Sequence, residues 1–164
     1  MNAIVAADEN WAIGRDGKLL VHLSGDLKYY RRRTEGHHIV IGRRTLESFP
    51  GGRPLPHREN IVLTGNERYH RPDCTVCYSL TQLLLYLAGL PDEEIFVSGG
   101  ATVYRQLLPY CSTVYVTHIR RAFAGADCHF PDLTADDAFR MTDRSAEREE
   151  QGVRYYFATY QRIG

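Results

Sequence analysis

The chain of 164 residues lacks the features that mark membrane, exported and metal-binding proteins. No apolar run approaches the ~18–20 residues that cross a bilayer. The first residues contain no basic segment of the kind that begins a signal peptide. The seven histidines show no H-x-x-x-H or similar ligand spacing, which argues against a metal site. We therefore expect a cytoplasmic protein with no membrane partner and no bound metal.

An excess of charge is also absent, because 20 Lys and Arg residues balance 20 Asp and Glu residues. Nucleic-acid-binding proteins normally carry a basic excess, so this balance argues against a nucleic-acid partner. Lysine itself is scarce, since Lys18 and Lys28 are the only two and the other basic residues are arginines. Arginine binds phosphate and carboxylate through paired hydrogen bonds. The excess of arginine over lysine is compatible with anion recognition, but a biased genome composition would explain it equally well.

The four cysteines, Cys74, Cys77, Cys111 and Cys128, do not indicate disulfide or redox chemistry. A chain of this size can build a hydrophobic core without disulfides. Cys74 and Cys77 form a C-x-x-C pair, but they flank Thr75-Val76, which is typical of a strand and not of a helix start. No second pair is present to complete a zinc site.

The composition, 43% hydrophobic and 24% charged, is that of a globular domain. Short apolar segments alternate with helical ones, which predicts βαβ crossovers. We expect one α/β domain over residues 1–164, with a mainly parallel central sheet, an antiparallel C-terminal hairpin and about four flanking helices. The expected strands cover residues 2–7, 38–41, 60–64, 75–78, 95–98, 113–119, 137–145 and 153–162. The expected helices cover residues 24–34, 43–48, 79–89 and 101–108, with Ser24 and Ser79 as caps.

Two strand ends run through glycine directly into a helix. One is Gly99-Gly100, and the other is Gly42 followed by Arg43-Arg44-Thr45. Open α/β sheets bind ligands at the carboxyl ends of their strands, and glycine lets a phosphate approach the backbone there. A tight turn or a solvated charged pair explains each junction alone, and the G-x-G-x-x-G fingerprint is absent. Together the two junctions favour a ligand with more than one phosphate.

Asp26 is the most informative acidic residue, because it follows a polar, Gly-punctuated loop over residues 8–23. Loops of this length in compact domains often line binding sites. An aspartate in the first turn of a helix stabilises the helix dipole, by roughly 0.3–1 kcal/mol. Alternatively, its carboxylate faces a pocket and binds a cationic or amidine-like group.

Taken together, these segments resemble the dihydrofolate reductase family over nearly the whole chain. Each segment is a weak signal alone, but their order and spacing are specific. The matching pieces are Ala6, Ile13-Gly14, Asp26-Leu27 and residues 41–48, 52–60, 97–104, 115–119 and 129–132. The resemblance implies NADPH-dependent reduction of 7,8-dihydrofolate to 5,6,7,8-tetrahydrofolate, in which hydride passes to pterin C6 and N5 takes a proton. It also implies a role in one-carbon metabolism and thymidylate synthesis, and sensitivity to antifolates.

The resemblance further implies roles for individual residues. Asp26 and Thr117 match the catalytic pair, in which the acid holds the 2-amino and N3 side of the pterin. Arg58 matches the arginine that binds the glutamate α-carboxylate. The other expected substrate-binding residues are Ile4, Ala6, Leu27, Tyr30, Phe49, Leu55, Ser98 and Tyr104. The expected cofactor-binding residues are Ala6, Ile13, Gly14, Gly42, Arg43, Arg44, Thr45, Leu63, Thr64, Gly99, Gly100, Ala101, Thr102 and Val103.

Two departures from the family pattern keep alternatives open. Val21 stands where the family usually has a tryptophan whose indole fixes a water near the pterin, and Ser98 replaces a usual aliphatic residue. The alternatives are a pyrimidine reductase of riboflavin synthesis and a non-catalytic relative that binds NADPH or antifolates. Asp26, Thr117 and Arg58 together favour an active enzyme, which we expect to be a monomer.

Overall fold

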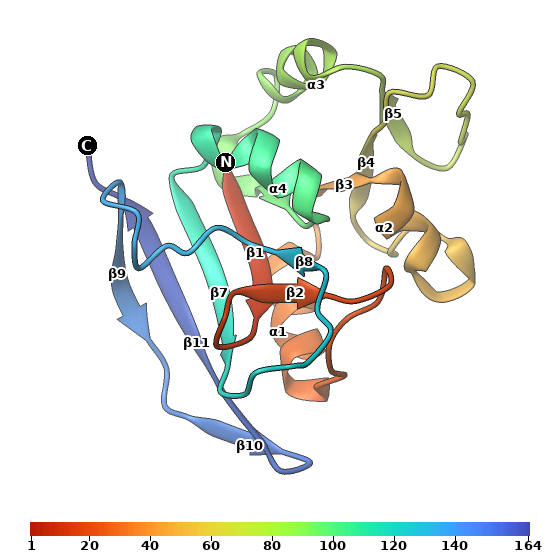
Figure 1. Cartoon of the computed structure of the whole chain (residues 1–164). Helices are drawn as coiled ribbons and strands as arrows, with labels where there is room; N and C mark the ends of the chain where they lie inside the picture. The colour runs from red at the N-terminus through yellow and green to blue at the C-terminus, as the bar shows by residue number, and fades with distance from the viewer.

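The computed structural model describes residues 1–164 and contains a nine-stranded sheet flanked by four α-helices (Figure 1). The strands of this sheet are β1 (Asn2–Ala7), β3 (His38–Gly42), β4 (Glu59–Leu63), β5 (Thr75–Cys77), β6 (Ile95–Val97), β7 (Thr113–Ile119), β9 (Phe139–Arg144), β10 (Arg148–Glu150) and β11 (Val153–Arg162). The helices are α1 (Ser24–Thr34), α2 (Arg43–Ser48), α3 (Leu80–Leu87) and α4 (Ala101–Leu107). Short 3-10 turns cover Pro50–Gly52, Asp92–Glu94 and Leu108–Tyr110. None of the helices has the length and apolar character needed to cross a membrane.

The strand order is β10-β11-β7-β1-β6-β3-β4-β5, and β9 also pairs with β11. Strands β1, β3, β4, β5, β6 and β7 pair with one another in parallel, and β11 pairs with β7 in antiparallel orientation. The chain passes from β1 to β3 and later returns through β6, which lies between them. The carboxyl ends of β7, β1, β6 and β3 therefore lie side by side at one edge. A ligand site in an open α/β sheet is expected at this edge.

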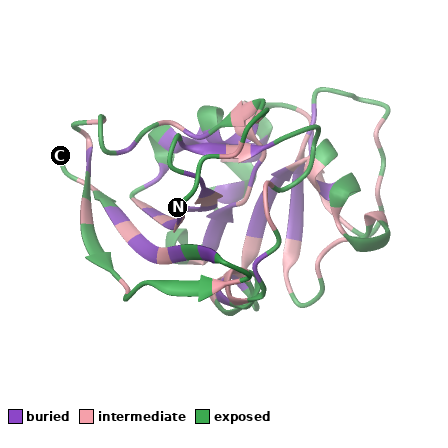
Figure 2. Cartoon of the chain, turned by 60° about the horizontal axis from the view of Figure 1, so that its bottom comes forward, coloured by how far each residue is buried: buried purple, intermediate pink, exposed green.

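The core lies on both faces of the sheet. A cluster of 24 buried residues packs under α3 and α4, and a cluster of 12 packs under α1 and α2. Figure 2 shows the central strands largely buried and the outer turns exposed. Because helices cover both faces of the sheet, central strands such as β3 are nearly continuous apolar runs. Such runs can be predicted as strands from the sequence.

Most of the predicted elements are confirmed. Helix α2 covers the expected residues, and α1 ends at Thr34 as expected. Ser79 caps α3, because its Oγ accepts a hydrogen bond of 3.0 Å from the backbone N–H of Gln82. The fold class, a mainly parallel sheet with an antiparallel C-terminal part and about four helices, is also confirmed.

The prediction that Ser24 caps α1 is wrong. The helix begins at Ser24 itself, and the preceding residue Leu23 makes no side-chain cap. Instead, the carboxylate of Glu150 accepts hydrogen bonds from the backbone N–H groups of Ser24 and Gly25, at 2.6 and 3.1 Å. The acceptor comes from a strand 125 residues away, so local sequence rules do not find it.

The expected C-terminal hairpin is only partly right. Strand β10 forms the hairpin with the first part of β11, and β9 pairs with the last part of β11. Two short strands thus share one edge of the ten-residue β11. The loop over residues 8–23 also contains a strand, β2 (Ala12–Gly14), which pairs with β8 (Cys128–His129).

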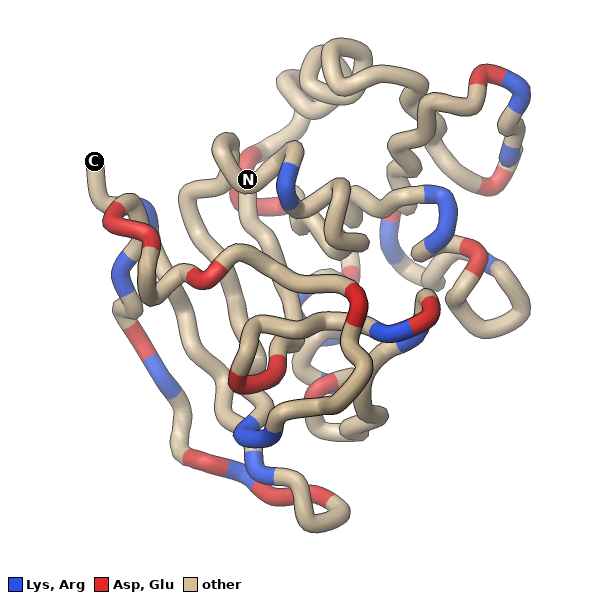
Figure 3. Tube along the Cα trace, in the orientation of Figure 1, with Lys and Arg blue, Asp and Glu red and all other residues tan.

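Charged residues of both signs occur along the outer strands and loops, while the central strands are mostly free of charge (Figure 3). Among them, Arg120 and Arg154 both lie within 4 Å of the Glu147 carboxylate. The four cysteines are all free.

Candidate active site

Asp26 and Thr117 meet at the carboxyl end of β7. The Thr117 hydroxyl donates a hydrogen bond of 2.6 Å to Asp26 Oδ1, and Thr117 is only 1% exposed. Helix α1 lies across the sheet here, because the Tyr29 ring stacks on Phe157 of β11 with centroids 4.0 Å apart. Burial raises the pKa of the Asp26 carboxyl, the Thr117 hydrogen bond lowers it and the negative charge of Glu150 raises it. The carboxyl is therefore closer to protonation than an exposed aspartate.

The first turn of α1 has little freedom to move. The Ser24 hydroxyl also donates to Glu150, at 3.1 Å, in addition to the two backbone hydrogen bonds. A Cβ atom at Gly25 would lie 2.1 Å from the Tyr155 hydroxyl oxygen, so only glycine fits. Hydrogen bonding to Ser24 and Gly25 holds the pKa of Glu150 below its ordinary value. These contacts fix the position of Asp26, which is the next residue.

Apolar side chains form a wall beside Asp26 on the α1 face of the sheet. Ala6, Tyr30, Phe49 and Leu55 are partly buried against the 12-residue cluster, and all four are predicted substrate-binding residues. Leu27 is 39% exposed. The structure therefore brings a carboxyl group and an apolar surface together, as a flat heterocyclic ligand with N–H groups requires.

Tyr30 and Ser98 make a contact that the sequence did not indicate. The Tyr30 hydroxyl donates a hydrogen bond of 3.0 Å to Ser98 Oγ, directly after the end of β6. Burial raises the pKa of Tyr30, so the phenol stays protonated as a donor. The bond ties the helix that carries Asp26 to the strand that leads into Gly99.

Arg58 lies at the far end of this wall. Its Nη1 donates a hydrogen bond of 3.2 Å to Thr34 Oγ1, and its Nε donates one of 2.9 Å to the Pro56 carbonyl. The guanidinium carbon is 5.9 Å from the centroid of the Tyr30 ring. Nη2 makes no hydrogen bond within the chain, so a carboxylate can bind there.

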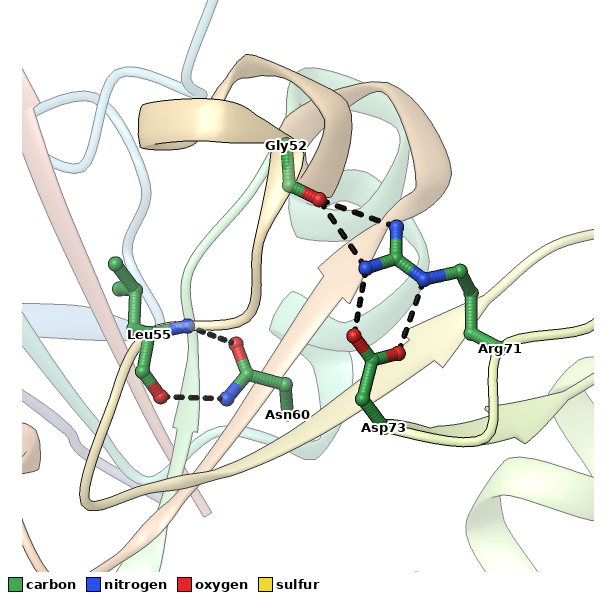
Figure 4. A network of polar contacts seen from close by, with 5 residues as sticks. All are labelled: Gly52, Leu55, Asn60, Arg71 and Asp73. Atoms are coloured by element: carbon green, nitrogen blue, oxygen red, sulfur yellow. Dashed lines mark hydrogen bonds and ion pairs between the residues drawn. The ribbon is translucent and has the colours of Figure 1, made fainter.

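The loop that carries Leu55 is held by two polar side chains, Asn60 and Arg71 (Figure 4). The Asn60 side chain accepts a hydrogen bond from the Leu55 N–H and donates one to the Leu55 carbonyl, each of 3.0 Å. The Arg71 guanidinium donates two hydrogen bonds, of 3.1 and 3.2 Å, to the Gly52 carbonyl. Sequence analysis missed both residues. Arg71 binds a backbone group 19 residues away, which no local signal indicates, whereas Asn60 binds the backbone of Leu55 and Arg58 in the loop directly before it.

The two glycine junctions lie against each other. The Gly42 N–H donates a hydrogen bond of 2.9 Å to the Gly99 carbonyl. A Cβ at Gly42 would lie 3.3 Å from a Val103 methyl group, and one at Gly100 would lie 3.6 Å from Thr45 Oγ1. The Gly99-Gly100 peptide bond is cis. The two strand–glycine–helix junctions, which lie far apart in the sequence, are therefore neighbours in the structure.

Hydrogen-bond donors surround these glycines. Arg44 and Thr102 are exposed, Thr45 is partly exposed, and Arg43 forms an ion pair of 3.4 Å with Glu47. Backbone N–H groups, hydroxyls and guanidinium groups are the donors that bind phosphates, so the set fits a pyrophosphate cofactor. The structure places the other predicted cofactor residues at the end of β1 (Ala6), on β2 (Ile13 and Gly14), at the end of β4 (Leu63 and Thr64) and on α4 (Ala101 and Val103).

Two of the predicted site residues use their hydroxyl groups in hydrogen bonds to other residues of the chain. The Thr64 hydroxyl accepts a hydrogen bond of 3.2 Å from the Asn66 N–H. The Tyr104 hydroxyl donates one of 2.6 Å to the Ile4 carbonyl, and burial raises the pKa of Tyr104 well above its usual range. Tyr104 packs in the cluster under α4, and its buried phenol lies close enough to Tyr30 and Asp26 to interact with them electrostatically.

Known proteins resemble this chain over nearly its whole length. The family model described as dihydrofolate reductase matches residues 1–162. The chain belongs to the dihydrofolate reductase family. It is 39% identical over 160 residues to the dihydrofolate reductase of Bacillus subtilis (strain 168), covering 97% of this chain and 92% of the relative. The enzyme of Staphylococcus haemolyticus is 35% identical over 164 residues, covering 99% and 96%.

The solved structures include a similar fold. The dihydrofolate reductase of Enterococcus faecalis, complexed with NADP(H) and RAB-propyl, aligns with a TM-score of 0.85 at 32% identity. The alignment covers 99% of this chain and 96% of that one. The family resemblance expected from the sequence is therefore confirmed, together with its fold.

Val21 is the loop position at which the sequence is expected to depart from the family pattern. Val21 is partly buried against the core cluster under α1, and the next residue, His22, is exposed. The only tryptophan of the chain, Trp11, packs in the cluster under α4 beside Phe130. Trp11 therefore does not take the place of the missing loop tryptophan.

Proposed function

We propose that the protein reduces 7,8-dihydrofolate to 5,6,7,8-tetrahydrofolate with NADPH, and that Asp26 and Thr117 are its catalytic pair. Membership of the family over residues 1–162 supports the reaction and its cofactor. The observation that carries the residue assignment is the 2.6 Å hydrogen bond between Thr117 and a partly buried Asp26. The product serves one-carbon metabolism and thymidylate synthesis.

The substrate lies, in this proposal, along the α1 face of the sheet. The Asp26 carboxylate accepts the two N–H groups on the 2-amino and N3 side of the pterin. Leu27, Tyr30 and Phe49 surround the pterin and the aminobenzoyl ring, and Arg58 binds the α-carboxylate of the glutamate. Ile4, Ala6, Leu55, Ser98 and Tyr104 complete the proposed substrate site.

NADPH supplies the hydride when it is bound. The residues proposed to hold it lie around the glycine junctions and at the adjoining strand ends. They are Ala6, Ile13, Gly14, Gly42, Arg43, Arg44, Thr45, Leu63, Thr64, Gly99, Gly100, Ala101, Thr102 and Val103. The two glycine junctions lie side by side, joined by the hydrogen bond from the Gly42 N–H to the Gly99 carbonyl, and this supports the assignment.

Asp26 is proposed to govern the proton that N5 of the pterin receives. It is the ionisable group of the proposed pterin site, and burial raises its pKa. A carboxyl group whose pKa is raised toward neutrality keeps a protonated fraction and favours protonated substrate. Thr117 holds the carboxyl group in place through Oδ1 and leaves Oδ2 for the pterin.

We also propose that residues 1–164 form one catalytic domain that acts as a monomer without a nucleic-acid partner, in the cytoplasm where its substrates occur. A single sheet takes strands from residues 2 to 162, which supports one domain that contains all the proposed site residues. The interspersed charges support the absence of a nucleic-acid partner (Figure 3).

The loss of NADPH absorbance after addition of 7,8-dihydrofolate tests this function. We expect steady turnover with dihydrofolate and none with a ribosylamino-pyrimidine substrate of riboflavin synthesis. Turnover of the pyrimidine alone would favour the riboflavin reductase. NADPH binding without turnover of either substrate would favour a non-catalytic relative.

A further inference from the structure

We propose that Asn60 and Arg71 are positioning residues that set the affinity for the aminobenzoyl-glutamate part of the substrate. They hold the loop that begins at Phe49 and ends at Arg58. The inference rests on the proposed function, because that function assigns the loop residues Phe49, Leu55 and Arg58 to this part of dihydrofolate. Neither Asn60 nor Arg71 is proposed to touch the substrate.

Beyond the short 3-10 turn over Pro50–Gly52, the loop has little regular hydrogen bonding of its own. Its three prolines, Pro50, Pro54 and Pro56, lack a backbone N–H donor. Gly51 and Gly52 have φ values of 67° and 64°, which interrupts any continuous helix or strand. Contacts from outside the loop must therefore determine where its side chains lie.

Asn60 fixes the middle of the loop. Its Oδ1 accepts a hydrogen bond of 3.0 Å from the Leu55 N–H, and its Nδ2 donates to the Leu55 carbonyl at 3.0 Å and to the Arg58 carbonyl at 3.1 Å. Asn60 is 3% exposed, so water does not compete for these bonds. Figure 4 shows the two bonds to Leu55. Both donor hydrogens and the acceptor of the amide are thus used on two loop residues.

Arg71 fixes the beginning of the loop. Two of its N–H groups converge on the Gly52 carbonyl, and Nε and Nη2 donate to the Asp73 carboxylate at 3.0 and 2.8 Å. Figure 4 shows the guanidinium between these two partners. Hydrogen bonding to Arg71 holds the pKa of Asp73 below its usual range, so the pair remains charged. Asp73 thereby orients the guanidinium toward the Gly52 carbonyl.

The end of the loop has separate supports. The His57 carbonyl accepts a hydrogen bond of 2.7 Å from the Gly36 N–H, and the Arg58 side chain reaches Thr34. Arg58 is thus held against the end of α1, while Gly52 and Leu55 depend on Arg71 and Asn60. Loss of Arg71 should loosen the loop around Gly52 and leave Asp26, which lies on α1, in place.

Two substrates separate this effect from a general loss of activity. We would measure kcat and KM at saturating NADPH with dihydrofolate and with 6-methyl-7,8-dihydropterin, which keeps the reacting atoms but has no aminobenzoyl-glutamate. Arg71→Ala should raise the KM for dihydrofolate about three- to tenfold, as loss of one or two hydrogen bonds implies, with kcat unchanged. The KM for the tail-less pterin should not change. Arg58→Leu provides the reference for a lost carboxylate contact.

Arg68→Ala is the matched control, because it removes the same charge from the same segment and the Arg68 side chain makes no hydrogen bond. It should behave as the wild type with both substrates. Arg71→Lys should raise the KM for dihydrofolate by a smaller factor, since an ammonium group on a flexible chain does not reproduce the planar fork. Asn60→Asp loses both donors and should act in the same direction as Arg71→Ala.

Several results would overturn the inference. Equal losses with both substrates would mean a general structural role, and equal effects of Arg68→Ala and Arg71→Ala would mean a nonspecific charge effect. An unchanged KM in Arg71→Ala would also contradict it. Thermal unfolding checks that each variant is folded, and Arg71→Lys serves if Arg71→Ala is not. Wild-type protein that reduces neither substrate would instead refute the proposed function.

Discussion

Opposing effects act on the carboxyl group of Asp26. Burial and the nearby Glu150 carboxylate raise its pKa, while the hydrogen bond from Thr117 lowers it. The neighbouring titratable groups are the phenols of Tyr29, Tyr104 and Tyr155, whose pKa values are themselves raised by burial. These phenols stay neutral over the working pH range. Glu150 is therefore the charged residue that acts on Asp26 from outside α1.

Glu150→Gln tests this electrostatic effect. The variant keeps an oxygen that can accept from the Ser24 N–H, but it removes a negative charge that favours protonated Asp26. We expect the fall of kcat/KM for dihydrofolate with rising pH to shift toward lower pH. Glu149→Gln makes the same change at the exposed neighbouring residue and should leave the profile in place. A shift of the Glu150→Gln profile to higher pH would contradict this view.

Helix α1 is the element on which the site depends most. It carries Asp26, Leu27 and Tyr30, and its first turn is held by backbone N–H groups that donate hydrogen bonds to Glu150 of the C-terminal hairpin. Tyr155 of β11 packs so closely on Gly25 that no side chain fits there. The chain thus uses its last strands to position the first functional helix.

Gly25→Ala should destabilise the protein. The added methyl group would overlap the Tyr155 hydroxyl, and we expect a loss of about 1–3 kcal/mol in the free energy of unfolding, measured by urea denaturation. Tyr155→Phe in the Gly25→Ala background removes the closest atom and should recover part of the loss. Gly65→Ala, where a Cβ meets no atom within 4 Å, should have little effect. Equal stability of Gly25→Ala and the wild type would show that this contact does not constrain α1.

The sequence predicted the elements whose signals are local. Strand β3 is an apolar run that ends at glycine, and α2 lies between Gly42 and the prolines that follow it. Strands β2 and β8 were missed, because they have three and two residues and pair only with each other across a long stretch of chain. Strand β10 was missed because its three residues, Arg148–Glu150, are all charged and show no apolar alternation.

The site residues divide in the same way: sequence motifs predicted some of them, and others are defined only by contacts between residues far apart in the sequence. The family motifs predicted Asp26, Thr117 and the glycine junctions, and the structure brings each of these groups together. The Tyr30–Ser98 bond joins residues 68 positions apart, and the Arg71–Gly52 contact joins two loops. No periodicity or spacing rule encodes such pairs, so they emerge only from the folded chain.

At the scale of the whole molecule, one partly buried histidine links folding to pH. His118 follows Thr117 in β7 but lies on the opposite face, near Trp11, Tyr156 and Tyr160. Its ring nitrogen lies 2.8 Å from the Tyr160 hydroxyl oxygen. Burial, with a smaller effect from Arg144, lowers the pKa of His118 to about 4, and Asp132 opposes this change.

Acid should therefore destabilise the fold. The unfolded chain takes up a proton at His118 near its ordinary pKa of 6.5, whereas the folded chain does so only near 4. Stability is lost as pH falls through this window, because the unfolded state binds more protons. We expect His118→Gln to show a smaller loss of unfolding free energy between pH 6.5 and 4 than the wild type. Parallel losses in the two proteins would contradict the assignment.

The central claim is that this chain reduces dihydrofolate with the help of an acid at Asp26. The most direct measurement is the pH profile of kcat/KM for NADPH-dependent reduction of 7,8-dihydrofolate by the wild type and by Asp26→Asn. We expect the variant to lose activity by on the order of 10²-fold or more at neutral pH and much less at acid pH, where solution supplies the proton. An equal loss at every pH, or no loss at all, would contradict this account.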